Sequence, residues 1–168
     1  KLFATLDTTI RPLYPDTRPK VLMSDTVGFI KKLPHDLVAS FKSTLDEAAS
    51  ASLLLFVVDA SDPSFRSHLD VTRKVLAEVG ATDVPSLLVL NKRDRLGPDE
   101  LAALKAEYPD AFFLSTRNKD DLQALRERIM GYFESDMLDE ELHIPFTAQK
   151  VVAEIRARMR ILSEAYDA

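Results

Sequence analysis

The sequence predicts a doubly wound α/β fold, in which helices cover both faces of a mainly parallel β-sheet. Short apolar runs of strand length alternate with longer segments of helical periodicity, and each apolar run is followed at once by a polar residue. Strands that are apolar on both faces are typical of parallel sheets buried between helices. A length of 168 residues and a hydrophobic content of 46% suit one globular domain carrying a short additional element.

Four apolar runs are expected to form the strands. They lie at 21–23, 53–58, 86–90 and 112–114. The segments between and after these runs place apolar residues three or four positions apart, which is the spacing of an amphipathic helix. Helices are therefore expected at 37–48, 69–79, 101–108 and 122–133. This alternation of strands and helices is what a parallel sheet with crossover helices requires.

Residues 136–168 depart from this alternation. An acidic stretch at 136–141 has no clear period, and it leads to Leu142–Phe146 and then to a helical pattern over 148–166. We predict that residues 1–135 form one domain and that 136–168 form a linker with a small strand–helix element. The last helix has an apolar stripe flanked by basic residues, which favours packing on its own domain; a partner-binding helix is the alternative.

Composition excludes several classes of function. Without cysteine, the chain has no disulfides, no thiolate catalysis and no cysteine-ligated zinc. The longest apolar runs are far shorter than the roughly 20 residues of a membrane-spanning helix. A net charge of −5 argues against DNA as a direct partner. An apolar signal segment is not found at the start, which favours a cytoplasmic protein.

Polar motifs follow three of the predicted strands. Ligands of an open parallel sheet bind beyond the carboxyl ends of its strands, so these positions are candidates for a site. The first motif is Asp25-Thr26-Val27-Gly28, where a carboxylate can hold the water shell of Mg²⁺ and a glycine lets a phosphate approach the backbone. Asn91-Lys92-Arg93-Asp94 follows the third strand, and Ser115-Thr116-Arg117 follows the fourth.

The second motif has the chemistry needed to recognise guanine. The Asp94 carboxylate can accept hydrogen bonds from N1–H and from the exocyclic amine of guanine, and adenine lacks this pair of donors. Asn91 would tie the base to neighbouring loops, and the stem of Lys92 would lie along the face of the ring. Backbone N–H groups at residues 115–117 could contact the guanine carbonyl oxygen. DxxG, NKxD and a serine-led turn at successive strand ends therefore predict a guanine-nucleotide site.

With these motifs in this order, the sequence resembles translation-factor-class P-loop GTPases, and more narrowly the HflX family of ribosome-associated GTPases. The narrower resemblance rests on Phe3-Ala4-Thr5-Leu6-Asp7, on residues 25–30 with 33–42, and on residues 58–63. These stretches look like that family's switch I, its switch II with the following helix, and the end of the next strand. The resemblance covers most of the chain and implies a GTPase G domain that binds GTP or GDP with Mg²⁺ as cofactor.

The resemblance also implies roles for individual residues. Thr5 would be the switch I threonine that joins Mg²⁺ when the γ-phosphate is present, with Thr8 and Thr9 as nearby alternatives. Because the family usually has proline where Thr8 stands, this switch I is expected to be less stiff than usual. Asp25 would hold Mg²⁺ through water, and Gly28 would sense the γ-phosphate. The implied nucleotide-binding set is Phe3, Ala4, Thr5, Leu6, Asp7, Asp25, Thr26, Val27, Gly28, Asn91, Lys92, Arg93, Asp94, Ser115, Thr116 and Arg117.

One departure from the usual GTPase pattern concerns hydrolysis. Phe29 occupies the position where many GTPases carry the glutamine that orients the attacking water, and an apolar ring cannot do this by hydrogen bonding. We therefore assign no catalytic residue and expect slow intrinsic hydrolysis that a partner stimulates. The resemblance implies that this partner is the ribosome, through its large (50S) subunit, and that the task is the splitting or rescue of stalled ribosomes.

A second departure concerns the phosphates. The motif GxxxxGK followed by Ser or Thr is absent, because none of the four glycines precedes such a pair. In the family this loop lies just upstream of switch I, so we expect a longer protein to supply it and residues 1–168 alone to bind GTP weakly without hydrolysing it. A nucleotide-sensing module without significant catalysis is the alternative, which Phe29 supports. A receiver-type phosphoacceptor domain would not need the guanine-reading Asp94.

Overall fold

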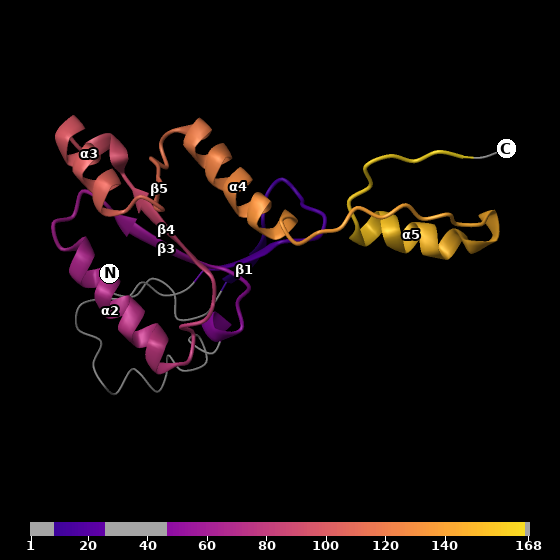
Figure 1. The fold of residues 1–168 in the computed structure, drawn as a ribbon, viewed down its shortest axis with the longest axis horizontal. Helices are drawn as coiled ribbons and strands as arrows, with labels where there is room; N and C mark the ends of the chain where they lie inside the picture. Colours follow the sequence, from indigo (N-terminus) through magenta and orange to yellow (C-terminus); the bar gives the residue numbers. More distant parts are fainter. Residues whose placement is uncertain (1–8, 26–46, 167–168) are drawn as a thin grey trace. The chain divides into compact units, whose positions relative to one another are not determined.

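The computed structural model describes residues 9–25 and 47–166, which belong to two compact units. One unit comprises residues 28–137, and the other comprises residues 1–27 together with 138–168. The second unit thus joins both ends of the chain, which the predicted division into 1–135 and 136–168 does not anticipate. Figure 1 shows the elements of each unit along the chain.

The larger unit is built on a parallel sheet with the strand order β3-β4-β5. These strands are β3 (Leu54–Asp59), β4 (Ser86–Asn91) and β5 (Phe112–Phe113). Strand β3 pairs with β4 along its whole length, which places Asp59 directly opposite Asn91. Strand β5 pairs with β4 near the same end, with Phe113 opposite Leu90. The predicted strands at 53–58, 86–90 and 112–114 are therefore confirmed, and their carboxyl ends meet at one edge of the sheet.

Helices connect these strands, as an α/β fold requires. They are α2 (Phe65–Glu78), α3 (Pro98–Glu107) and α4 (Lys119–Glu134), with a 3-10 turn η1 (Arg93–Arg95) after β4. In Figure 1, α2 and α3 lie on one side of the sheet and α4 lies on the other. The predicted α/β class is therefore confirmed. In the described ranges 9–25 and 47–166, each helix is too short or too polar to cross a membrane.

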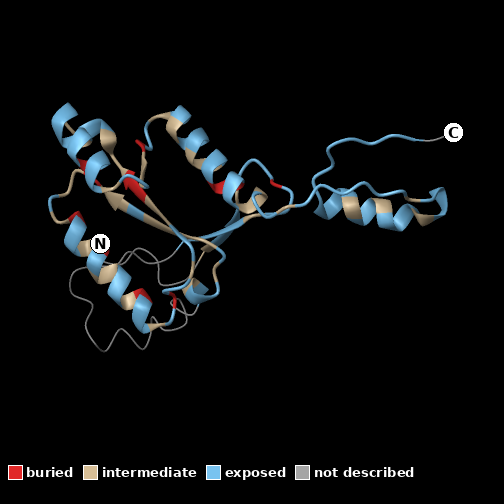
Figure 2. Cartoon of the chain, viewed as in Figure 1, coloured by how far each residue is buried: buried red, intermediate tan, exposed pale blue. Residues whose placement is uncertain are grey.

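The core of the larger unit lies between the sheet and helices α2 and α3. Leu90 of β4 is fully buried and packs with Phe65 of α2 and Leu104 of α3. Figure 2 shows such buried positions in red on the strands and on the inward faces of the helices. Burial of these side chains supplies the hydrophobic stabilisation that holds the strand ends in register.

We expect Leu90→Ala to lower the free energy of unfolding by about 2–5 kcal/mol, because it leaves a cavity in a fully buried position. Urea denaturation of the full-length protein, followed by circular dichroism, measures this change. Leu138→Ala is the matched control, since Leu138 is 84% exposed and its truncation should change stability little. Equal effects of the two substitutions would contradict the position assigned to Leu90.

The smaller unit contains a β-hairpin at its start. Strands β1 (Thr9–Pro12) and β2 (Leu22–Asp25) pair antiparallel, with Thr9 opposite Asp25. The turn between them is held by Thr17, whose Oγ1 accepts the N–H of Val21 at 2.8 Å. The strand predicted at 21–23 is present as β2, but it was expected in the parallel sheet, whereas it pairs antiparallel with β1 in a separate two-stranded sheet. Strand β1 was not predicted, because a short run containing Arg11 and Pro12 gives no apolar signal.

The end of the chain supplies a 3-10 turn η2 (Phe146–Ala148) and helix α5 (Gln149–Arg158). The predicted helix is therefore present but ends at Arg158, before the predicted end at Tyr166. Arg18 donates a hydrogen bond to the carbonyl of Arg156 and so satisfies one acceptor near the helix terminus. Residues 142–145 are described and form no strand, and Pro145 lacks the backbone N–H that strand pairing uses.

Candidate guanine-nucleotide site

The structure brings the second and third predicted motifs together at one edge of the sheet. Asn91 is the last residue of β4 and Lys92-Arg93-Asp94 follows it, while Ser115-Thr116-Arg117 comes shortly after β5, the parallel neighbour of β4. Asp25 is the exposed last residue of β2 in the smaller unit. Phe3, Ala4, Thr5, Leu6, Asp7, Thr26, Val27, Gly28 and Phe29, and almost all of the helix predicted at 37–48, lie outside the described residues.

The loop after β4 reverses its direction at Lys92. This residue has a φ angle of 63°, in the left-handed region that residues other than glycine rarely adopt. Its N–H donates to Asn91 Oδ1 at 2.7 Å, and its Nζ donates to Asp59 Oδ2 at 2.5 Å. Such backbone conformations persist where surrounding contacts fix them, and they concentrate at functional sites. The reversal places Asp94 within the turn η1, at the edge of the sheet.

Two hydrogen bonds lock the loop after β4 to the loop after β5. Asn91 Oδ1 accepts the N–H of Thr116 at 3.2 Å, in addition to that of Lys92. In return, the N–H of Arg93 donates to the carbonyl of Leu114 at 3.1 Å. Asn91 therefore links the two loops, and these hydrogen bonds hold the loops side by side.

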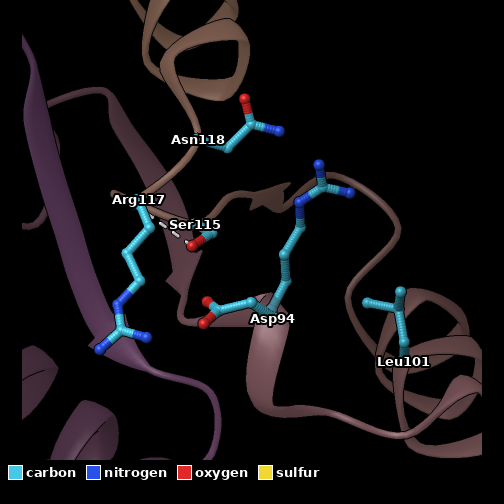
Figure 3. Close-up of a pocket in the computed structure, with 6 residues that line it drawn as sticks. Asp94, Leu101, Ser115, Arg117 and Asn118 are labelled. Atoms are coloured by element: carbon cyan, nitrogen blue, oxygen red, sulfur yellow. Dashed lines mark hydrogen bonds between the residues drawn. The ribbon is translucent and has the colours of Figure 1, made fainter.

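A cavity of about 390 Å³ opens between these loops. Its lining consists of Arg93, Asp94, Leu101, Ser115, Arg117 and Asn118. In the close-up of Figure 3, the carboxylate of Asp94 points toward Ser115 and Arg117. Ser115 is almost fully buried, whereas Asp94 is exposed to the cavity side of the loop. The cavity therefore presents the accessible carboxylate of Asp94 next to the buried side chain of Ser115.

The electrostatics of the cavity keep Asp94 ionised. A hydrogen bond from the Ser115 hydroxyl lowers the pKa of Asp94, and the positive charges of Arg117 and Arg95 act in the same direction. An ionised carboxylate is a hydrogen-bond acceptor only. It therefore matches the two adjacent donors of guanine and disfavours adenine, whose N1 is itself an acceptor.

Asp59 is a site neighbour whose contact with Lys92 the sequence analysis missed. Its Oδ1 accepts hydrogen bonds from the N–H and the hydroxyl of Ser61, at 3.0 and 2.6 Å. The other carboxylate oxygen pairs with Lys92 Nζ. Partial burial opposes ionisation of Asp59, but the hydrogen bonds from Lys92 and Ser61 outweigh it and lower its pKa. The parallel register of β3 and β4 is the signal that could have revealed this pair.

Asp121 is the second missed residue. It lies in the first turn of α4, where its side chain is 12% exposed and accepts hydrogen bonds from the guanidinium of Arg93 and from the N–H of Ser115. The Arg93 contact is the main cause of a lowered pKa for Asp121. The stability that comes from this shift is fully present above the unfolded-state pKa of about 3.9 and is lost as the pH falls through the lower folded-state value.

We expect Asp121→Asn to lower the free energy of unfolding by about 1–2 kcal/mol at pH 7, because it weakens a charge-assisted pair at a mostly buried position. The difference from the unmodified protein should shrink as the pH falls below about 4 and disappear below the lower folded-state pKa, where Asp121 is protonated in both states. Urea denaturation across this pH range tests it. Asp120→Asn removes an exposed charge from the same helical turn and should show no such dependence.

The described residues offer one part of the predicted Mg²⁺ site. Asp25 presents an exposed carboxylate at a strand end, an oxygen donor that would hold Mg²⁺ through water. Thr5, the other predicted ligand, lies outside the described residues. Within the part of the chain that the structure describes, no group of three or more His, Asp or Glu side chains could hold a metal ion by itself.

Comparison with known proteins identifies the family. A family model described as "50S ribosome-binding GTPase" matches residues 1–92. GTPase HflX of Gluconacetobacter diazotrophicus is 59% identical over 99% of this chain, and this match covers 37% of that relative. The chain belongs to the HflX family of ribosome-associated GTPases. The predicted resemblance to this family is thereby confirmed.

Other members of the HflX family match with lower identity. GTPase HflX of Treponema denticola is 42% identical over 77% of this chain and 34% of its own length. GTPase HflX of Escherichia coli strain K12 is 42% identical over 78% of this chain and 32% of its own length. The chain therefore spans between about a third and two fifths of the HflX relatives that it matches. Among solved structures, a crystal structure of a variant of SsGBP aligns with a TM-score of 0.56 and 25% identity, covering 74% of this chain and 45% of that one.

Proposed function

We propose that the full-length protein binds GTP and GDP together with Mg²⁺, hydrolyses GTP, and acts as a nucleotide-dependent switch on the large ribosomal subunit. The observation that carries this proposal is the Asp94 carboxylate lining a cavity between two loops that hydrogen-bond to each other, in a member of a 50S ribosome-binding GTPase family. Ribosome association would place this work in the cytoplasm, and splitting or rescue of stalled ribosomes is the task that we propose.

The proposed base site divides recognition among three kinds of contact. Asp94 accepts hydrogen bonds from N1–H and the exocyclic amine of guanine, which provides selectivity over adenine. The stem of Lys92, fixed at its tip by Asp59, covers one face of the base. The loop formed by Ser115, Thr116 and Arg117 would lie beside the guanine carbonyl oxygen. Its three N–H groups donate to Asp121, Asn91 and Ser115 Oγ in this structure, so a contact with that oxygen requires one of them to exchange or share its acceptor.

The proposed phosphate end of the site uses residues from the first part of the chain. Phe3, Ala4, Leu6 and Asp7 would wrap the nucleotide, and Thr5 and Asp25 would hold Mg²⁺. Bound Mg²⁺ neutralises charge on the β- and γ-phosphates, which favours phosphoryl transfer to water. The loop of Thr26, Val27 and Gly28 would change its conformation with the presence of the γ-phosphate, as nucleotide switches do.

We also propose that residues 1–168 alone bind GTP weakly, because the sequence contains no GxxxxGK motif to hold the phosphates. A second candidate function is nucleotide sensing without significant catalysis. The observation that favours it is Phe29, which supplies no hydrogen bond to an attacking water. The two candidates share the base site and differ in whether γ-phosphate cleavage occurs at a useful rate.

The ribosome part of the proposal is tested by sedimentation of the full-length protein with purified 50S subunits. We expect co-sedimentation with a non-hydrolysable GTP analogue and much less with GDP, because the γ-phosphate orders the switch segments. Purified 30S subunits serve as the control. Equal sedimentation in GDP, in the GTP analogue and without nucleotide would contradict a nucleotide-dependent switch.

The role given to Asp59 leads to a further prediction. Asp59→Asn should weaken GDP binding about two- to fivefold, because it removes a partly exposed ion pair that orients Lys92. Asp62→Asn is the matched control: Asp62 belongs to the same loop and accepts the N–H of Ser64, away from Lys92. Fluorescence titration with a labelled GDP measures both, and equal weakening by the control would contradict this role.

A further inference from the structure

A carboxylate outside all three motifs holds the base-reading loops together. Asp121 accepts two hydrogen bonds from the guanidinium of Arg93, from Nε at 2.7 Å and from Nη2 at 2.6 Å. The oxygen that accepts Nε also accepts the N–H of Ser115, at 2.7 Å. One side chain from helix α4 is thus bonded at once to the loop after β4 and to the loop after β5.

The two partners of Asp121 are the immediate neighbours of Asp94. Arg93 precedes Asp94 in the turn η1, and the Asp94 carboxylate points toward the Ser115 side chain (Figure 3). Both partners also line the cavity. Any separation of Arg93 from Ser115 therefore changes the position or the orientation of Asp94. Guanine selectivity depends on that orientation, since two hydrogen bonds must be aligned at the same time.

A second pair in the same unit shows what distinguishes Asp121. Arg66 binds Glu107 with the same two-point geometry, at 2.8 Å from Nε and 2.5 Å from Nη2. Both of those side chains are exposed, at 49% and 41%, and they join α2 to α3 away from the base-reading loops. The Asp121 side chain is 12% exposed and also fixes a backbone N–H. The Arg93–Asp121 pair is therefore better shielded from water than the Arg66–Glu107 pair, and Asp121 is bonded to both loops.

We propose that Asp121 is a positioning residue for base selectivity: by clamping Arg93 to the backbone of Ser115, it holds the Asp94 carboxylate in the orientation that two guanine donors require. This inference rests on the proposed function, because it assumes that Asp94 reads guanine. It adds a selectivity determinant that lies outside the DxxG, NKxD and serine-led motifs. Asp121 itself is not among the residues that line the cavity.

The test compares the dissociation constants of GDP and inosine diphosphate in the full-length protein. Hypoxanthine, the base of inosine diphosphate, lacks the exocyclic amine of guanine. The dissociation constant of inosine diphosphate divided by that of GDP therefore measures how well Asp94 is aligned with this amine. Asp121→Asn should lower this ratio about fivefold or more, since a lost hydrogen bond changes an equilibrium by roughly this factor. Glu107→Gln, which alters the matched pair, should leave the ratio within about twofold.

A double-mutant cycle separates positioning from general loosening of the fold. In an Asp94→Asn background, Asp121→Asn should have little further effect on the ratio, because the group that it positions has been replaced. Arg93→Lys provides a second variant that keeps the charge and loses the two-point geometry, and it should give an intermediate ratio. Circular dichroism confirms that each variant is folded.

The outcomes distinguish this inference from the function on which it rests. An unchanged ratio in both Asp121→Asn and Arg93→Lys overturns the clamp while leaving guanine binding intact. An equal fall with Glu107→Gln also overturns it, because the effect would then be a general loss of stability. If the unmodified protein itself fails to prefer GDP to inosine diphosphate, the proposed base site is wrong.

Discussion

An Asp94→Asn variant is expected to lose its preference for guanine and to gain affinity for xanthine nucleotides. The amide of asparagine presents one acceptor and one donor group in place of two acceptor oxygens, so it cannot receive both guanine donors. Xanthine carries a carbonyl where guanine carries its amine, and that carbonyl can accept from the new amide N–H. We expect GDP binding to weaken by about ten- to a hundredfold, the effect typical of a lost two-point contact.

Competition between labelled GDP and unlabelled GDP or xanthosine diphosphate, in the full-length protein, measures this exchange of preference. Asp99→Asn is the matched control, because it removes an exposed carboxylate in the first turn of α3. It should leave both affinities unchanged. An Asp94→Asn variant that still prefers GDP by the original factor would show that another group reads the base.

Slow hydrolysis that the large ribosomal subunit accelerates is the second expected result. Phe29 cannot hydrogen-bond the attacking water, so the full-length protein alone should turn over GTP slowly. Contact with 50S subunits should raise the single-turnover rate by at least about tenfold, since groups supplied by a partner can contribute much larger factors in other GTPases.

Single-turnover measurements of GTP hydrolysis, with Mg²⁺ in excess, test this stimulation by 50S subunits, and 30S subunits serve as the control. An intrinsic rate that is already fast without ribosomes would contradict the dependence on a partner. A rate that stays negligible with 50S subunits would favour the alternative of nucleotide sensing without significant catalysis. The Asp94→Asn variant should show the same stimulation with xanthosine triphosphate, which links the two predictions.

The parts of the fold that the sequence predicts best are those set by local pattern. The apolar runs at 86–90 and 112–114 become β4 and β5 almost unchanged. Helix α2 begins before its predicted start, although its first residue, Phe65, is apolar and buried. The helices predicted at 101–108 and 122–133 start late because the first residues of α3 and α4 are polar or proline and carry no apolar period. In α3 and α4 those turns are stabilised instead by caps: Glu100 accepts the N–H of Gly97, and Asn118 accepts that of Asp120.

The parts that the sequence does not predict depend on contacts between distant residues. Lys92 pairs with Asp59, which lies 33 positions earlier, and Arg93 pairs with Asp121, which lies 28 positions later. Whether such charges meet depends on strand register and on the direction of a loop, and the left-handed Lys92 sets that direction. The motifs identify which groups can read guanine, whereas the acidic residues that hold them in place become visible only in the folded chain.

Titration of the full-length protein with labelled GTP, GDP and ATP in the presence of Mg²⁺ tests the central claim most directly. We expect tight binding of GTP and GDP, and ATP binding weaker by at least about a hundredfold, because adenine offers Asp94 no pair of donors. Comparable affinity for ATP, or no measurable binding of any guanine nucleotide, would contradict the proposal that the loops after β4 and β5 form a guanine-nucleotide site.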